Sequence, residues 1–288
     1  MAHVHLDEEA KELLRELHRK AKAGPPVKKA PVTAPMPAVV EAVSVSTIAP
    51  DPVSVAKPVV VEEVIAIPAI TESGDGSSRS AAAAQIAALA ARAEKSTAAR
   101  GLGTLRETMV FSVGNPEAEL MLVGEAPGYH EEREREPFVG PAGQKLNEIL
   151  KAMGLSREAI YISNIVKFRP AMPGQTTNNR KPTPEEMAAC LPFVRAEVGV
   201  VRPKCIVALG ATAAEGLLGL TGTVAAMRGK WHEFEGIPAR VTYHPAYLLH
   251  GTAGQGDKRK IWEDMLAVMA QLGLPISDKQ RGYFLPKA

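Results

Sequence analysis

The sequence predicts an α/β protein in which a parallel sheet lies between two layers of helices. Short, wholly apolar segments recur along the chain, and each is short enough to be a buried strand. Segments with the 3.6-residue period of a helix follow them. Strands that alternate with helices in this way are typical of a parallel sheet covered on both faces. We expect strands at 108–113, 120–123, 161–166, 205–209 and 240–243, and helices at 81–99, 144–153, 183–200, 211–218 and 257–272.

The composition allows one sizeable domain with appendages and sets limits on its partners. The 288 residues are 45% hydrophobic, and 34 basic side chains balance 32 acidic ones to a net charge of +2. Any contact with nucleic acid therefore needs a local basic patch. The two cysteines, Cys190 and Cys205, form no Cys-x-x-Cys pair, which fits a reducing cytoplasm. The N-terminus lacks a signal-peptide pattern, so we expect a soluble, cytoplasmic protein with no membrane partner.

Three regions follow one another along the chain. Residues 1–23 have the period of an amphipathic helix, with acids early and bases late. This helix is either a solubilising cap or a peptide that binds a partner. Residues 24–80 are rich in Pro, Ala and Val, and the prolines interrupt helix and strand alike, so we expect a largely disordered linker. Residues 81–288 form the folded domain, which begins with an alanine-rich helix.

The segment that directly follows the 120–123 strand is the strongest candidate for a binding site. Gly124-Glu125-Ala126-Pro127-Gly128 forces a sharp turn, and in a parallel sheet such a turn faces the ligand crevice. We expect an acidic, charged loop to lead from this turn to Phe138. An acid in the turn and this aromatic downstream suit a flat, polar ring. The alternative is a tight strand-to-helix connection that binds nothing.

Further polar residues follow other strands, and strand ends of one sheet converge on one crevice. Asn164 carries the donor and acceptor needed to bind an amide edge, or it caps a turn. His244 can donate a hydrogen bond to an oxygen that gains negative charge, or it is a structural histidine. Leu248 and Leu249 form either an exposed wedge for a base stack or part of the core.

These segments together resemble the uracil-DNA glycosylase superfamily, most closely its family 4. The resemblance rests on LMLVGEAPG with PFVGPAG, then NIVKFRP, ALGATAAEGLL, MRGKW and HPAYLL, and covers about residues 105–270. It implies a three-layer sandwich with a central four-stranded parallel sheet. It also implies an enzyme of base-excision repair that flips uracil out of single- or double-stranded DNA and hydrolyses its N-glycosidic bond.

The resemblance also implies roles for single residues. Glu125 and Ala126, in the turn that continues through Pro127 and Gly128, would meet the sugar and base. Phe138 would stack on uracil, Asn164 would bind its edge, and His244 would donate to its O2. Leu248 and Leu249 would enter the minor groove, and Glu131 would lie beside the pocket. The water-directing aspartate of the best-known branch falls at Ala126, which leaves the water to Glu125, Glu131 or a backbone carbonyl.

Family 4 carries a four-iron cluster on four cysteines, and this chain departs from that pattern. The corresponding positions are about Thr97 and Arg100, then Phe168 and Cys190, so only one cysteine remains. One thiolate cannot hold a cubane cluster. We therefore expect no iron–sulfur cluster, apolar packing around Phe168, and a buried Cys190.

Basic residues near the motifs are the candidate DNA contacts. His250 replaces the basic residue that usually closes the last motif, and a patch of other bases can compensate: Arg169, Arg180, Lys181, Arg228 and Lys230. The alternative is a scatter of solvated charges. Two other functions also stay open, a catalytically weak DNA-binding scaffold and a glycosylase for deaminated purines. We expect a monomer whose N-terminal arm can recruit a replication or repair protein.

Overall fold

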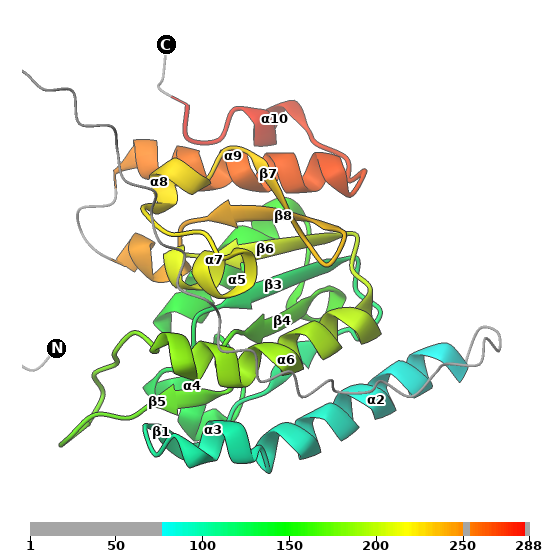
Figure 1. Cartoon of the computed structure of the whole chain (residues 1–288). Coiled ribbons are helices and arrows are strands. Elements are labelled where there is room, and N and C mark those ends of the chain that lie inside the picture. The colour runs from blue at the N-terminus through cyan, green and yellow to red at the C-terminus, as the bar shows by residue number, and fades with distance from the viewer. Residues whose placement is uncertain (1–76, 250–253, 286–288) are drawn as a thin grey trace, which may run out of the picture. The chain divides into compact units, whose positions relative to one another are not determined.

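The computed structural model describes residues 77–249 and 254–285 (Figure 1). The expected N-terminal helix at 1–23, the expected linker up to residue 76, and His250 lie outside the described residues. The first described element, α2 (Ser77–Glu94), begins inside the segment expected to be linker, and α3 (Thr97–Gly101) follows it. Thus the alanine-rich segment forms two helices where one was expected.

The central sheet has six strands in the order β2-β4-β3-β6-β8-β7, and not the four that were expected. Its inner strands are parallel: β4 (Tyr161–Asn164), β3 (Leu120–Gly124), β6 (Cys205–Leu209) and β8 (Ile237–Thr242). Two antiparallel edge strands complete it, β2 (Ser112–Gly114) and β7 (Trp231–Phe234). β7 joins β8 through Glu235 and Gly236, whose φ angles of 51° and 78° suit a tight hairpin.

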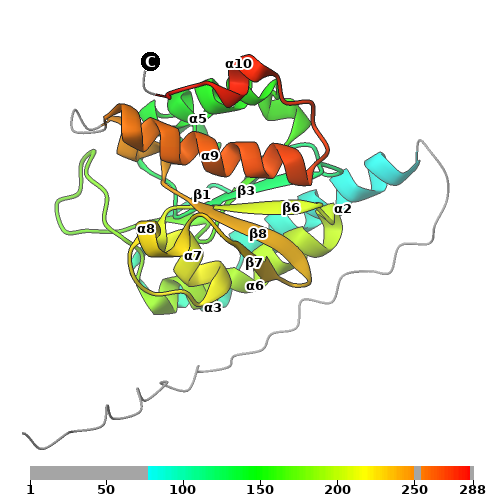
Figure 2. The same cartoon turned by 90° about the horizontal axis from the view of Figure 1, so that it is seen from above.

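Helices cover both faces of this sheet (Figures 1 and 2). Alternate residues of a strand point to opposite faces, so Leu122 packs with α5 (Pro141–Met153) and α9 (Gln255–Gln271). Its neighbours Met121 and Val123 pack with α6 (Pro184–Val201) and α7 (Ala211–Leu218). The three-layer arrangement therefore agrees with the expected fold class. No helix among the described residues is long and apolar enough to cross a membrane.

The segment expected to be the first strand divides into two strands that belong to different sheets. β1 (Leu105–Met109) pairs with β5 (Phe168–Pro170) in a separate antiparallel pair, whereas β2 joins the central sheet. The charged segment after Gly128 was expected to be a loop and forms α4 (Tyr129–Glu134). The remaining elements are short: η1 (Arg157–Ala159), α8 (Val224–Met227), η2 (Pro245–Leu249) and α10 (Asp278–Arg281).

A buried ion pair ties the turn after β4 to α6. Lys167 and Glu197 are both fully buried, with 2.5 Å between Lys167 Nζ and Glu197 Oε2. The hydroxyls of Ser163 and Tyr161 donate hydrogen bonds to the same carboxylate, at 2.9 and 3.0 Å. A buried charge needs such partners, because desolvation would otherwise cost several kcal/mol. Ser163 precedes Asn164, so this network holds one edge of the candidate site.

Candidate active site

One pocket lies at the carboxyl ends of β3, β4 and β8, where the crevice of a parallel sheet is expected. Its volume is about 290 Å³, close to the lower end of the range of about 300–1,000 Å³ for small-molecule sites. Segments far apart in the sequence meet there. The predicted residues that line it are Glu125, Ala126, Pro127, Gly128, Glu131, Phe138, Asn164, Arg180 and His244.

Phe138 is held in a backbone conformation that few non-glycine residues adopt. Its φ is 56°, and its side chain is only 5% exposed. Arg157 fixes this turn by donating to the carbonyl oxygens of Phe138, at 2.9 Å, and of Pro137, at 2.7 Å. A strained conformation persists where its surroundings determine it, and such positions cluster at functional sites.

Two glycines allow the backbone and the pocket side chains to come this close together. A Cβ on Gly124 would lie 2.4 Å from Asn164 Oδ1 and 2.5 Å from Phe138 Cζ. A Cβ on Gly143 would lie 1.7 Å from the carbonyl oxygen of Phe138. The glycines therefore bring Phe138 and Asn164 against the end of β3.

His244 presents one ring nitrogen as a donor. The backbone N–H of Ala246 donates to His244 Nδ1 at 3.2 Å, so Nδ1 carries a lone pair and the proton of the neutral ring lies on Nε2. Burial lowers the pKa of His244 to about 4, although the charge of Glu131 opposes this shift. The ring stacks on Phe138 with 5.6 Å between centroids and 29° between planes. At neutral pH the imidazole is uncharged and is a donor through Nε2.

The two pocket carboxylates have different surroundings. Burial raises the pKa of Glu125, while a hydrogen bond with Thr212 and the charge of Lys181 oppose the rise. Both oxygens of Glu131 accept backbone hydrogen bonds, from Gly128 N–H at 3.1 Å and Gly140 N–H at 2.9 Å. Glu131 therefore fixes the two ends of the loop, and Glu125 is the carboxylate with the freer oxygens.

Asn179, which was not among the residues predicted from the sequence, also lines the pocket. Its Oδ1 accepts a hydrogen bond from Arg169 Nε at 2.9 Å, and its Nδ2 lies near Gly128, since a Cβ added there would be 3.1 Å away. The residue belongs to the β5–α6 loop, which projects from the domain (Figure 1). The adjacent asparagines before Arg180 were the available signal, but only the fold shows which one reaches the pocket.

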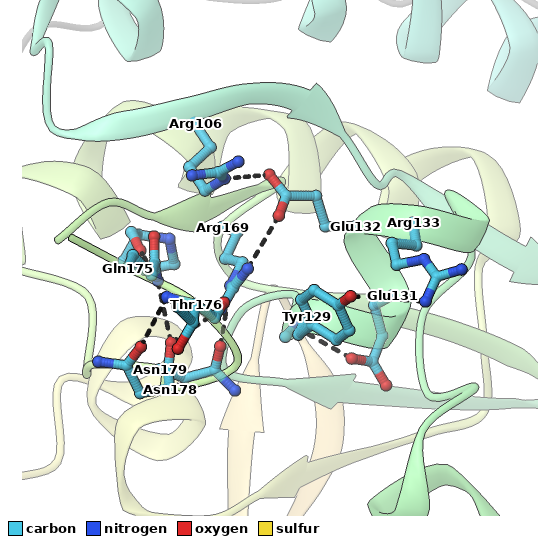
Figure 3. Close-up of polar contacts among 12 residues, drawn as sticks. Arg106, Tyr129, Glu131, Glu132, Arg133, Arg169, Gln175, Thr176, Asn178 and Asn179 are labelled. Atoms are coloured by element: carbon cyan, nitrogen blue, oxygen red, sulfur yellow. Dashed lines mark hydrogen bonds and ion pairs between the residues drawn. The ribbon is translucent and has the colours of Figure 1, made fainter.

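Three of the predicted DNA contacts make ion pairs within the protein. Arg169 is 1% exposed and binds Glu132, Asn179 and two loop carbonyl groups (Figure 3). Arg180 pairs with Glu186, and Arg228 pairs with Asp264. The guanidinium groups of these three arginines are therefore already paired with carboxylates, and their expected contact with DNA stays a prediction. Lys181 and Lys230 are exposed, and Lys181 pairs with Glu215 at 2.6 Å.

The two leucines after His244 differ in their surroundings. Both lie in η2, and Leu249 is 44% exposed. Leu248 is half-buried and lines a separate hollow with Ile149, Trp262 and Phe284. Leu249 is therefore the residue of this tip that is free to act as a wedge.

The positions that correspond to the cluster cysteines do not fit a cluster. The guanidinium carbon of Arg100 lies 5.3 Å from the ring centroid of Phe168, which is 1% exposed. Cys190 is fully buried, and burial raises the pKa of its thiol to about 11, against formation of a thiolate ligand. No group of three or more His, Cys, Asp or Glu in the described part of the chain could hold a metal ion.

Comparison with known proteins identifies the family. The uracil DNA glycosylase superfamily matches residues 111–266, more than half of the chain. The type-4 uracil-DNA glycosylase of Thermotoga maritima is 40% identical over 165 residues, which cover 56% of this chain and 81% of that protein. The type-4 enzyme of Archaeoglobus fulgidus is 42% identical over 149 residues, 49% of this chain and 72% of that protein. Since the matched segment contains the pocket and the strands that form it, the chain belongs to the uracil DNA glycosylase superfamily.

Proposed function

We propose that this protein excises uracil from DNA by hydrolysing the N-glycosidic bond of an extruded nucleotide. The observation that carries the proposal is the convergence of Phe138, Asn164 and His244 on one pocket of about 290 Å³. A planar ring, a donor–acceptor amide and a neutral imidazole donor are the groups that bind a pyrimidine and stabilise its anion. The type-4 relatives named above support the same activity.

His244 is the proposed donor to the departing base. Cleavage leaves an oxocarbenium-like sugar and a uracil anion whose charge gathers on O2. His244 Nε2–H donates to this oxygen, and the hydrogen bond strengthens as the oxygen becomes negative. A donor of this kind contributes roughly 3 kcal/mol to transition-state stabilisation. Phe138 stacks on the ring, and Asn164 binds its amide edge.

Placement of the attacking water is assigned to Glu125 and Asn179. Both line the pocket, whereas both oxygens of Glu131 already accept backbone hydrogen bonds. The amide of Asn179 is oriented by Arg169, which leaves its NH₂ group for the water or the substrate. The described residues of the pocket include two carboxylates, Glu125 and Glu131. Of these, Glu125 is the one whose oxygens do not accept backbone hydrogen bonds, so it is the carboxylate proposed to face the sugar.

We also propose that the enzyme works without an iron–sulfur cluster. One buried thiol and the contact of Arg100 with Phe168 occupy the positions where the family has its four cysteines. Residues 81–288 are proposed as the catalytic domain. The segments 1–23 and 24–80 are proposed as an arm for a replication or repair partner. We further propose a cytoplasmic monomer.

The test is excision from uracil-containing oligonucleotides, single- and double-stranded, followed by alkali to cleave at abasic sites. With the wild-type protein we expect alkali to cleave the oligonucleotide at the position of the uracil. His244→Ala removes the O2 donor, so we expect its single-turnover rate to fall by about 10²–10³. Asn164→Ala should also reduce the rate, because an unpaired uracil edge is left in the pocket.

The same assay distinguishes the other readings of the fold. Tight binding of uracil-containing DNA without cleavage would identify a scaffold protein. Release of hypoxanthine or xanthine in preference to uracil would identify a glycosylase for deaminated purines. Either result would overturn the proposed function.

A further inference from the structure

A second hollow shares α4 and the β5–α6 loop with the pocket. Its volume is about 650 Å³, and four of its lining residues are arginines. We call it the arginine groove and define it by Arg106, Arg133, Arg135 and Arg169 with Tyr129 and Glu132. Figure 3 shows Glu132 between Arg106 and Arg169, together with Tyr129 and Arg133 of the same helix, α4.

The groove has more positive charge than its single carboxylate can neutralise. Glu132 is shared, because Arg106 donates to its Oε1 and Arg169 donates to its Oε2 at 2.9 Å. Arg133 contacts the ring of Tyr129, at 5.6 Å from its centroid, and pairs with no carboxylate among the described residues. Arg135 is 66% exposed and lies 3.9 Å from Glu94, an exposed pair that is worth little.

The floor of the groove is fixed by the residue that also orients the pocket. Arg169 is buried, and its Nη2 donates to the carbonyl oxygens of Thr176 and Asn178. Its Nε donates to Asn179, which lines the pocket. The Arg169–Asn179 hydrogen bond therefore links the groove directly to the pocket.

We propose that the arginine groove binds the sugar–phosphate backbone of the strand that carries the uracil, close to the extruded nucleotide. This inference rests on the proposed function. Guanidinium groups bind phosphate oxygens in a bidentate manner, and Arg133 and Arg135 are the two that are not committed to a buried carboxylate. Tyr129, whose ring contacts the guanidinium groups of Arg133 and Arg169, adds an aromatic side chain to these charges, a combination typical of single-strand binding.

The test compares the full chain with the double variant Arg133→Gln/Arg135→Gln in fluorescence anisotropy with a uracil-containing single strand. A matched control, Arg195→Gln/Arg202→Gln, also removes two exposed charges. Arg195 pairs with Glu235 at the far end of the sheet, and Arg202, like Arg135, ends a helix at positive φ.

We expect the groove variant to bind DNA more weakly than the control and with a lower salt dependence. Loss of two phosphate contacts reduces the slope of log K against log salt by about 1.4, so the advantage of the wild type shrinks about sevenfold between about 50 and 200 mM salt. The single-turnover rate at saturating enzyme should match the wild type, because the pocket is unchanged. Cutting the strand back to the uracil on one side should abolish the difference.

Three results would overturn the proposal that the arginine groove binds DNA. The variant could bind no more weakly than the control, keep its defect on strands cut back on either side, or lose saturated rate without losing affinity. Excision by the wild type is scored separately. If the wild type excises uracil and the groove variant binds DNA normally, only the proposed role of the groove is rejected. If the wild type excises no uracil, the proposed function is rejected, together with the role of the groove that rests on it.

Discussion

At the scale of single residues, the protonation of His244 decides whether the pocket contains a charge. An isolated imidazole has a pKa near 6.5, and burial lowers that of His244 to about 4. The donor is therefore neutral across the physiological range. This fits a group that donates to a forming anion and transfers no proton.

The lowered pKa of His244 predicts how stability depends on pH. Below its ordinary pKa the imidazole takes up a proton in the unfolded chain, whereas folded His244 does so only near pH 4. Protonation between these values favours the unfolded chain. As the pH is lowered from about 6.5 to about 4, the free energy of unfolding therefore decreases, by at most about 3 kcal/mol. His244→Gln should weaken this fall, as thermal unfolding at about pH 7 and pH 5 would measure.

The carboxylates titrate in both proteins, so the difference between wild type and variant isolates the imidazole. An equal loss of stability in the wild type and the His244→Gln variant between about pH 7 and pH 5 would contradict a lowered pKa of His244.

At the scale of structural elements, the approach of α5 to the Phe138 turn depends on the absence of one side chain. Gly143→Ala would place a Cβ 1.7 Å from the carbonyl oxygen of Phe138, so the turn must move. We expect a loss of about 1–3 kcal/mol in the free energy of unfolding, together with weaker uracil binding. Gly101→Ala is the control, because nothing lies within 4 Å of its Cβ position. Urea denaturation would rank the two, and equal stabilities would contradict the packing.

The connection between β4 and α6 depends on the buried Lys167–Glu197 pair. Lys167→Met leaves the Glu197 charge buried without its cation, and we expect a loss of about 3–5 kcal/mol in unfolding free energy. Lys204→Met removes a lysine from an exposed pair with Glu119 and should cost at most about 1 kcal/mol. If chemical denaturation gives similar values for both variants, the buried pair does not stabilise the connection.

At the scale of the whole molecule, α2 and α3 are joined to the rest of the domain by side-chain packing. Relatives of family 4 are expected to have a metal cluster at this place. Arg100 on α3 contacts Phe168 on β5, beside the buried Cys190. We therefore expect purified protein to be colourless and to contain no stoichiometric iron by elemental analysis. A brown preparation with iron–sulfur charge-transfer absorption would contradict this.

Local patterns predicted the elements whose structure depends on local chemistry. Apolar segments predicted the four parallel strands. The capping box Thr183-Pro184-Glu185-Glu186 predicted the start of α6. The segment Tyr129–Glu134 was misjudged because its charges resemble a solvated loop. They form a helix because Glu131 accepts hydrogen bonds from the backbone at both ends of the connection. The edge strand β7 was missed because it is mostly exposed and its sequence lacks an apolar segment.

The sequence alone determined the α/β class, the turn after β3 and the shortage of cysteines, because spacing and residue type decide these. Only the tertiary structure decided that Asn179 reaches the pocket, that Arg169 is buried, and that Arg133 and Arg135 stay exposed. The physical reason is that every arginine carries the same charge in the sequence. Whether its guanidinium group can bind a ligand depends on which carboxylates and carbonyl groups folding brings within hydrogen-bond distance.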